Sequence, residues 1–282
     1  MKKIHPTAII HEGAELAPDV SVGPGAVIGP HVKLGPGVTV AEHVIIHGHT
    51  TMGERCRAYP GAIIGSDPQD LKFAGEDTAV QIGPRTVVRE FVTINKGTGG
   101  GGGCTSIGAD CMVMAYCHVA HDCVVENNVI MANCATLAGH VLIERGVHLS
   151  GMVGIHHFGT VGRLAFISGW STCRRDAPPF MILDGNPARV RGVNIVGLQR
   201  AGASRETIGA LRQCCRLLYH SALNQDAAVE RIRADGLDQH EEVKYLLDFL
   251  KRVEGGNLGR AREALRKQHG AHPPAPAGNQ GG

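Results

Sequence analysis

The chain has 282 residues, of which 43% are hydrophobic and 19% are charged, but only 4% are aromatic, and 39 are glycine. A formal net charge of +2 excludes a strong electrostatic attraction to nucleic acid or to an anionic membrane surface. No apolar run reaches the ~18 residues of a membrane-spanning helix, no apolar stretch follows Lys2 and Lys3, and the nine cysteines include no CxxC pair. We therefore expect a cytoplasmic protein with no membrane span, whose core consists of small side chains.

A six-residue repeat organises residues 1–190. Bulky apolar residues recur at every sixth position over three stretches, 4–64, 82–94 and 107–173. From Ala8 to Ser171, the residue two positions before each of them is Ala, Val, Thr, Cys, Gly or Ser, and a spacing of two places both residues on one face of a short strand. Glycine often follows the bulky residue, where the chain must bend. Short strands separated by bends predict an all-β solenoid for residues 1–190.

Two segments interrupt this repeat. In residues 65–81, Asp70 and Glu76 occupy the positions of core residues, which predicts a loop carried outside the solenoid. Residues 97–103 read GTGGGGG and predict a flexible loop. Because irregular segments on a rigid scaffold often carry binding and catalytic residues, both loops are candidate functional elements.

A helical domain is expected over residues 191–254. The hexad pattern stops after Cys173, and apolar residues then recur at helical spacing from Ile208 onward, with Ser204 as the N-cap. A second helix is expected over residues 226–233 and a third around residues 243–253. These helices would cover the open end of the solenoid. Residues 255–282 are polar and rich in Pro and Gly, and we expect a disordered tail.

The densest cluster of titratable side chains lies on the predicted solenoid. It comprises His118, His121, Asp122, His140, His156 and His157. None of these residues falls in the two inward columns. If three hexads form one coil, His140 stacks on Asp122 and His157 lies two coils beyond His121. An imidazole oriented by a carboxylate at such an edge is suited to general base catalysis.

The hexads resemble those of the hexapeptide-repeat acyltransferases, and longer motifs resemble the UDP-N-acetylglucosamine O-acyltransferase family. The motifs are residues 117–123 (CHVAHDC), 137–140 (LAGH), 69–76 (QDLKFAGE), 151–152 (GM), 185–187 (GNP) and 192–195 (GVNI). The resemblance implies a left-handed parallel β-helix, whereas the periodicity alone leaves the hand open. It also implies transfer of a 3-hydroxyacyl chain from acyl carrier protein to the 3-hydroxyl of UDP-N-acetylglucosamine, the first step of lipid A biosynthesis.

The same resemblance implies roles for individual residues. His121 corresponds to the general base, Asp122 to the group that orients it, and Gly139 to the backbone N–H that stabilises the oxyanion. The corresponding substrate-binding residues are Gln69, Asp70, Lys72, His118, His140, His156, His157, Asn194 and Arg200, and Gly169 corresponds to the residue that limits acyl length. His157 stands where Gln is common, Val196 where an acidic residue is found, and Ala201 where a second Arg follows. Trp170 beside Gly169 would narrow the space for the acyl chain.

The resemblance also implies partners. We expect no cofactor and no metal, since the acyl chain would arrive on the phosphopantetheine of acyl carrier protein. The resemblance implies a homotrimer with active sites between adjacent prisms. From the low net charge we expect no nucleic-acid partner. Arg205, Arg212 and Arg216 on the first long C-terminal helix are candidates for docking the acidic carrier protein, although a solvated helix face is the commoner explanation for such residues.

Three alternatives stay open at this stage. In the first, the acyl acceptor is a related nucleotide sugar that carries a 3-amino group. In the second, the protein is a metal enzyme of the γ-carbonic-anhydrase type, in which His118, His121 and His140 bind zinc. In the third, the solenoid is a scaffold without catalytic activity. The cysteines at hexad core positions, Cys56, Cys111, Cys117, Cys123 and Cys173, are expected to pack as small hydrophobic residues and not to act as nucleophiles.

Overall fold

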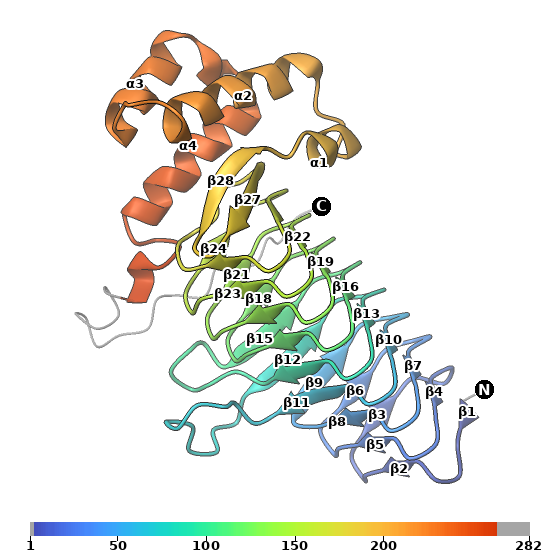
Figure 1. The fold of residues 1–282 in the computed structure, drawn as a ribbon. Helices are drawn as coiled ribbons and strands as arrows, with labels where there is room; N and C mark the ends of the chain where they lie inside the picture. Colours follow the sequence, from blue (N-terminus) through green and yellow to red (C-terminus); the bar gives the residue numbers. More distant parts are fainter. Residues whose placement is uncertain (1–2, 264–282) are drawn as a thin grey trace.

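The computed structural model describes residues 3–263, which form a three-sided parallel β-helix followed by a small group of helices (Figure 1). Each side of the prism is one sheet, in which each strand up to β27 pairs with the strand one coil away. Sheet A contains β1 (Lys3–Ile4), β4 (Ser21–Val22), β7 (Thr39–Val40), β10 (Arg57–Ala58), β13 (Val87–Val88), β16 (Met112–Val113), β19 (Ile130–Met131), β22 (His148–Leu149), β25 (Phe166–Ile167), β27 (Met181–Gly185) and β28 (Ala188–Val193).

The other two sides follow the same rule. Sheet B contains β2 (Ile9–Ile10), β5 (Val27–Ile28), β8 (Ile45–Ile46), β11 (Ile63–Ser66), β14 (Thr93–Asn95), β17 (His118–Val119), β20 (Thr136–Leu137), β23 (Gly154–Ile155) and β26 (Thr172–Cys173). Sheet C contains β3 (Glu15–Leu16), β6 (Lys33–Leu34), β9 (His49–Met52), β12 (Ala79–Ile82), β15 (Cys104–Ile107), β18 (Val124–Val125), β21 (Leu142–Ile143) and β24 (Thr160–Val161). The predicted β-solenoid is confirmed.

The hexad pattern explains this architecture. Ile10 pairs in register with Ile28 and Ile28 with Ile46, so one coil takes three hexads. The bulky column is buried along the axis of the prism, and the small column lies beside it at the corners, as Ile28 and Ala26 illustrate with no exposed surface. A narrow interior has no room for large rings, which explains the low aromatic content.

The corners place residues of successive coils on top of one another. At the corner between sheets B and C, Asp122, His140 and Phe158 have φ values of 59°, 62° and 60°. This left-handed conformation costs roughly 1 kcal/mol or more for a residue other than glycine, so the in-register pairing on both sides must hold it. The three side chains therefore form one column along the outside of the prism.

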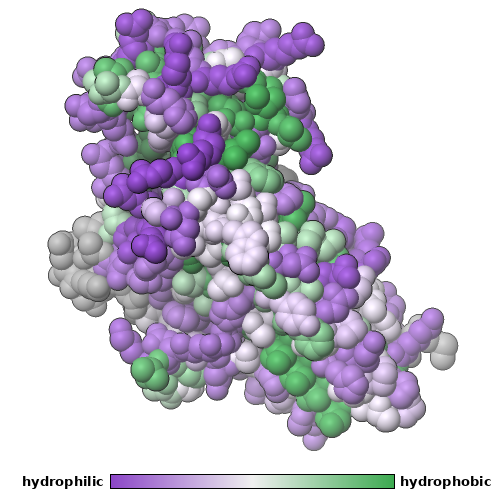
Figure 2. Space-filling model, in the orientation of Figure 1, coloured by the Kyte–Doolittle hydropathy of each residue, from purple (hydrophilic) through white to green (hydrophobic). Residues whose placement is uncertain are grey.

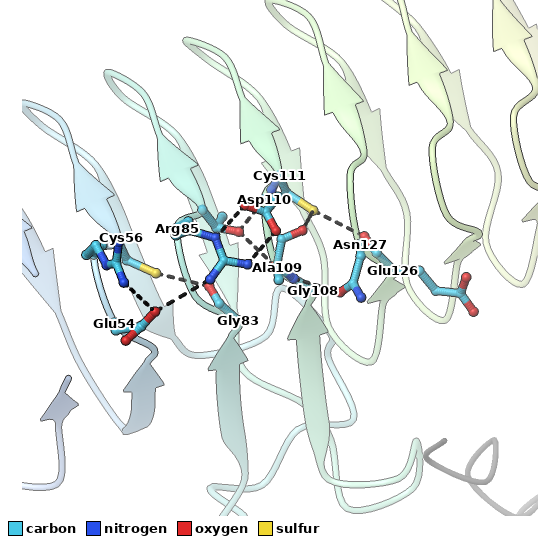
Figure 3. A network of polar contacts seen from close by, with 12 residues as sticks. Glu54, Cys56, Gly83, Arg85, Gly108, Ala109, Asp110, Cys111, Glu126 and Asn127 are labelled. Carbon is cyan, nitrogen blue, oxygen red and sulfur yellow. Dashed lines mark hydrogen bonds and ion pairs between the residues drawn. The ribbon is translucent and has the colours of Figure 1, made fainter. Parts of the chain in front are cut away.

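Polar contacts between coils reinforce the corner between sheets C and A (Figure 3). The Arg85 guanidinium donates to both carboxylate oxygens of Asp110 at 2.7 and 2.6 Å and lies 3.5 Å from the Glu54 carboxylate. Beneath them, the Cys56 thiol donates to the carbonyl oxygen of Gly83 at 3.0 Å, and burial raises the pKa of this thiol. The hexad cysteines are buried as expected of packing residues, and all nine cysteines are free.

The two interruptions leave the prism without disturbing its register. Ile64 pairs with Ile94 and Ile94 with Val119, although each pair spans one of the insertions. The first loop is shorter than the predicted 65–81, because β11 continues to Ser66 and β12 begins at Ala79. β12 pairs with both β9 and β15, and this pairing holds its buried Val80 in the sheet. The loop was predicted to be longer because Asp70 and Glu76 interrupt the hexad pattern before this strand.

The predicted domain boundary at residue 190 is wrong, because it falls inside β28. This strand runs antiparallel to β27, which continues sheet A by pairing with β25. The hairpin turns at Asn186 and Pro187, within the last sheet of the solenoid.

Four α-helices follow the hairpin within the described residues (Figure 1). They are α1 (Ile195–Arg200), α2 (Arg205–Tyr219), α3 (Gln225–Ala234) and α4 (Glu241–Glu254), with a short 3₁₀ helix, η1 (Leu237–Gln239), before α4. Ser204 caps α2 as predicted, accepting from the Thr207 N–H at 3.2 Å. The pattern missed α1, which is short. None of the helices described is long and apolar enough to cross a bilayer.

The prediction of a disordered tail over residues 255–282 is wrong for its first part, while residues 264–282 lie outside the described structure. After α4 the chain returns to the last coils of the β-helix. The Gly259 N–H donates to the Thr160 hydroxyl at 3.0 Å, and the Arg260 N–H donates to the half-buried carboxylate of Asp176 at 3.1 Å. A carboxylate that is largely removed from solvent needs hydrogen-bond donors. The polar composition of this segment did not predict that it would supply them.

Candidate active site

His121 and Asp122 lie at the corner between sheets B and C, where the αL conformation of Asp122 turns its side chain back toward the neighbouring imidazole. Nδ1 of His121 lies 2.8 Å from Oδ2 of Asp122. The Asp122 side chain is 1% exposed, whereas that of His121 is 13% exposed. The carboxylate is thus held inside, and the imidazole stands between it and solvent with Nε2 unused by Asp122.

The glycine-rich loop supplies the remaining donors to Asp122. The N–H and hydroxyl of Thr98 donate to the two carboxylate oxygens at 2.9 and 2.6 Å. Burial by itself raises the pKa of Asp122, but hydrogen bonds from His121 and Thr98 outweigh burial and hold the pKa below its ordinary value. Asp122 is therefore ionised at neutral pH. The loop packs over Asp122 at Gly101, where a Cβ would lie 2.0 Å from Oδ2, whereas Gly102 and Gly103 have open space at the Cβ position.

Gly139 makes room for the His121 ring. It lies one coil beyond His121, and a Cβ built there would be 2.6 Å from Cε1 and 2.7 Å from Nε2 of His121. A side chain at this position would collide with the imidazole, which explains the glycine without any special φ. The Gly139 N–H donates to no acceptor among the residues described, so a donor stands free beside Nε2.

A cavity of about 670 Å³ opens beside these residues. Its lining brings together six of the predicted site residues, Asp70, Lys72, His121, Gly139, His140 and His157. Nδ1 of His140 lies 3.8 Å from Oδ2 of Asp122, and its ring stacks on Phe158 with centroids 4.4 Å apart. The cavity thus combines imidazoles, a lysine and carboxylates on a partly apolar wall, which suits a polar substrate with an apolar part.

The loop between β11 and β12 reaches the cavity because its start is anchored. The buried Asn95 amide donates to the Ser66 hydroxyl at 3.1 Å and to the Asp67 carbonyl at 2.9 Å. Lys96 pairs with the Asp67 carboxylate at 3.0 Å and lies over the Phe73 ring at 5.0 Å. These contacts place Asp70 and Lys72 at the cavity, whereas Gln69 is exposed on the loop and does not line it.

His118 and His156 lie next to the cavity but do not line it. His118 is in β17, where Nδ1 lies 2.7 Å from the Thr93 hydroxyl of β14. Burial, followed by the nearby His121, lowers the pKa of His118. His156 contacts Arg260 through Nδ1, and burial together with the Arg260 charge lowers its pKa. Both imidazoles are therefore neutral near pH 7.

Asn194 and Arg200 line a second cavity of about 930 Å³. This cavity lies over sheet A and its corner with sheet C, on another side of the prism from His121. The Asn194 amide is already engaged, since it accepts from the Gly197 N–H at 3.0 Å and donates to the Leu164 carbonyl at 2.8 Å. Arg200 is exposed at the last turn of α1. The residues predicted to contact the nucleotide and those predicted to catalyse the reaction are therefore not brought together within one chain.

Gly169 lies at the third corner, between sheets A and B, away from both cavities. A Cβ at Gly169 would lie 3.3 Å from the Gly151 carbonyl oxygen. The Trp170 side chain is 76% exposed, so it does not fold over Gly169 within this chain.

The structure gathers a different trio from the one considered for zinc. Ligand atoms of His121, Asp122 and His140 lie within 4.8 Å of one another, but His118 is not part of this group. Asp122 is already saturated by Thr98 and His121, and the His121 Nδ1 is used in that contact. The donor set therefore fits an oriented imidazole better than a metal centre, and metal analysis of the purified protein distinguishes the two.

Several cavity residues were not predicted from the sequence. They are Phe73, Glu76, Thr98, Gly100, Ala138, Phe158 and Glu263. Phe158 was accessible to the same reasoning as His140, because it lies three hexads further along the same corner. Thr98 and Glu263 carried no such signal, since a loop and a C-terminal segment bring them to the site.

Comparison with protein families gives two matches. Residues 176–258 match the family described as UDP N-acetylglucosamine O-acyltransferase, domain 2, and residues 104–139 match the bacterial transferase hexapeptide repeat. The acyl-(acyl-carrier-protein)–UDP-N-acetylglucosamine O-acyltransferase of Verminephrobacter eiseniae is 52% identical over 82% of this chain and 88% of its own length. The protein of the same name from Synechocystis is 49% identical over 88% of this chain and 89% of its own length.

Solved structures agree with these relatives. LpxA from Acinetobacter baumannii has a TM-score of 0.85 and 37% identity, covering 88% of this chain and 96% of that one. The UDP-N-acetylglucosamine acyltransferase of Bacteroides fragilis has a TM-score of 0.84 and 34% identity, covering 88% and 96%. The similarity confirms that the β-helix is the left-handed type with C-terminal helices.

Replacing Gly139 with Ala should displace the His121 imidazole. The new Cβ would collide with Cε1 and Nε2, so we expect the His121 Nδ1–Asp122 Oδ2 contact to lengthen in a crystal structure of the variant. Gly154→Ala, in β23 of the next coil and with nothing within 4 Å of its Cβ position, is the control and should leave the contact unchanged. An unmoved imidazole in Gly139→Ala would contradict this account of the glycine.

Proposed function

The chain belongs to the family of acyl-(acyl-carrier-protein)–UDP-N-acetylglucosamine O-acyltransferases, and from this membership we propose its reaction and the roles of its residues. It transfers an acyl chain from acyl carrier protein to UDP-N-acetylglucosamine in lipid A biosynthesis. We propose that the transferred acyl chain is a 3-hydroxyacyl chain and that the acceptor is the 3-hydroxyl of the sugar. The observation that carries the mechanism is the His121–Asp122 pair at the cavity, with the Gly139 N–H free beside it.

Asp122 sets the protonation of the general base. An ionised carboxylate only accepts, so Nδ1 of His121 carries the proton and Nε2 keeps its lone pair for a substrate. Nε2 takes the proton of the sugar hydroxyl as the oxygen attacks the thioester carbon. The oxyanion that forms accepts from the Gly139 N–H. When the intermediate collapses, the C–S bond breaks and the thiolate takes the proton from Nε2, so no covalent enzyme intermediate and no cofactor are required.

Removing the base tests this mechanism. In His121→Ala we expect turnover to fall by about 10²- to 10⁴-fold, the usual contribution of general acid–base catalysis, with thermal stability nearly unchanged. The measurement is mass spectrometry of UDP-N-acetylglucosamine incubated with a panel of 3-hydroxyacyl carrier proteins. His11→Ala, an exposed histidine of the first coils, is the control.

Each outcome of this assay has a separate meaning. A monoacylated nucleotide sugar made by the wild-type protein supports the proposed reaction and reveals the preferred chain length. Retained turnover in His121→Ala would remove the base from the mechanism. Product with a 3-amino acceptor in place of the 3-hydroxyl sugar would shift the assignment to N-acylation.

We propose that the working enzyme is a homotrimer. The catalytic cavity, the cavity with Arg200, and Gly169 lie on different sides of one prism, although the family places their counterparts around one substrate. Neighbouring prisms would bring these parts together. Sheet B also carries an apolar streak across β5, β8 and β11 (Figure 2), where Val27, Ile45 and Ile63 stand in register on its outer face. Such a stripe is suited to self-association.

Mixing two inactive variants tests this arrangement. His121→Ala and Arg200→Ala subunits should each give trimers of low activity, whereas co-expressed subunits should recover part of it, because some interfaces then combine an intact His121 with an intact Arg200. Activity of the purified mixed trimers is the measurement. No recovery, or a monomer by light scattering, would contradict sites shared between subunits.

We propose that the acidic carrier protein docks on α2. Arg205, Arg212 and Arg216 are all exposed on this helix.

We place the reaction in the cytoplasm, since free cysteines suit a reducing compartment.

Charge reversal tests the docking surface. Arg212→Glu should weaken binding of acyl carrier protein, and the loss should shrink at high ionic strength because exposed charges are screened. Calorimetric or optical binding measurements at two salt concentrations give the result, with Arg233→Glu on α3 as the control. Unchanged carrier affinity would remove α2 from the docking surface.

A further inference from the structure

Residues 259–263, here called the C-terminal segment, make more contacts with the catalytic corner than a connecting tail requires. The Arg262 guanidinium donates to the carbonyl oxygens of His140 at 2.8 Å and Phe158 at 3.0 Å. Gly259 and the Arg260 backbone bond to Thr160 and Asp176 in the same and the following coil. The segment is thus attached by hydrogen bonds to the column that carries His140 and Phe158.

Two side chains of the segment reach histidines next to the cavity. Oε2 of Glu263 lies 3.1 Å from Nε2 of His157, and both residues line the cavity. A guanidinium nitrogen of Arg260 contacts Nδ1 of His156 and also donates to the His157 carbonyl oxygen at 2.9 Å. Arg260 is in turn 3.5 Å from the Glu263 carboxylate. The four side chains form one connected group.

The chemistry of this group assigns protons. A guanidinium only donates, so Nδ1 of His156 must accept, and the neutral ring then carries its proton on Nε2. Nδ1 of His156 also lies 3.4 Å from the His157 carbonyl oxygen, but that oxygen is better occupied by Arg260. A carboxylate only accepts, so Nε2 of His157 is a donor toward Glu263. Neither assignment is available without the C-terminal segment.

We propose that the C-terminal segment is part of the active site, in which Arg260 is a positioning residue that sets the tautomer of His156 and Glu263 orients the imidazole of His157. The proposal rests on the proposed acyl transfer, because it places these histidines beside the cavity where that reaction occurs. It gives a role to residues at the start of a polar stretch of the sequence that is rich in Pro and Gly. It also gives a reason for a histidine at position 157, because the Glu263 carboxylate faces it.

The charges around His156 set the direction of its titration. Burial lowers the pKa of His156 most, followed by the positive charge of Arg260 and by His157, whereas the hydrogen bond with the His157 carbonyl and the Glu263 carboxylate raise it. Removing the Arg260 charge should therefore raise the pKa of His156. It should also free Nδ1 to carry the proton, so that the tautomer changes along with the pKa. A role limited to packing would move neither.

Nuclear magnetic resonance of the full chain, without substrate, tests the assignment directly. With ¹⁵N-labelled histidine, and the His156 signals identified from their loss in His156→Gln, we expect the Nε2–H tautomer in the wild-type protein. In Arg260→Gln we expect a mixture of tautomers and a higher pKa. A wild-type ring protonated on Nδ1, or an unchanged ring in Arg260→Gln, would overturn the role of Arg260.

Kinetics test the rest of the proposal. Arg260→Ala and Glu263→Gln should each lower kcat/KM by about 10-fold, as small misplacements of site groups do, and Arg260→Lys should recover part of the loss. Arg233→Gln and Glu254→Gln, exposed on α3 and α4, are the matched controls. Wild-type kcat/KM in both segment variants would overturn the proposal. If the wild-type protein itself makes no acylated sugar nucleotide, the proposed function fails, and the resonance experiment still decides the tautomer.

Discussion

In-register stacking of the three-hexad coils is the constraint on which the rest of this structure depends. Most strands contribute only two residues to their sheet, so a single coil has almost no stability of its own and relies on pairing with the coils above and below. That pairing fixes what stands above each residue. His121 and Gly139 are one coil apart, and Asp122 and His140 form the adjacent column. The geometry of the candidate site is therefore a product of the repeat.

The two insertions use the same rigidity. Both leave the prism after a strand of sheet B and return at a strand of sheet C, so they emerge at the corner that carries His121. One brings Asp70 and Lys72 to the cavity, and the other brings Thr98 onto Asp122. Because the prism continues in register beneath them, loops can change here without displacing the histidines. The candidate site thus lies where the repeat is interrupted.

Two carboxylates, those of Asp122 and Asp176, accept hydrogen bonds from segments that are distant in the sequence. Asp122 is matched by donors from a loop and from the neighbouring imidazole, whereas Asp176 is matched by backbone N–H groups of Thr160 and Arg260. Burial raises the pKa of Asp176, but that of Asp122 is held low. The difference lies in the hydrogen bonds: those from His121 and Thr98 outweigh the burial of Asp122, whereas two backbone donors and the nearby charges of Arg260 and Arg262 do not outweigh burial at Asp176.

The sequence by itself determined the β-helix, because the hexad period states which side chains point inward. A coil of three hexads predicted that His140 stacks on Asp122 next to His121, motif resemblance added Gly139, and helical spacing predicted the capped helix α2. Only the tertiary structure decided that Thr98 covers Asp122, that Arg200 lies on another side of the prism, and that Arg260 and Glu263 return to the site. These contacts join segments with no shared periodicity, and long-range hydrogen bonds leave no local pattern in a sequence.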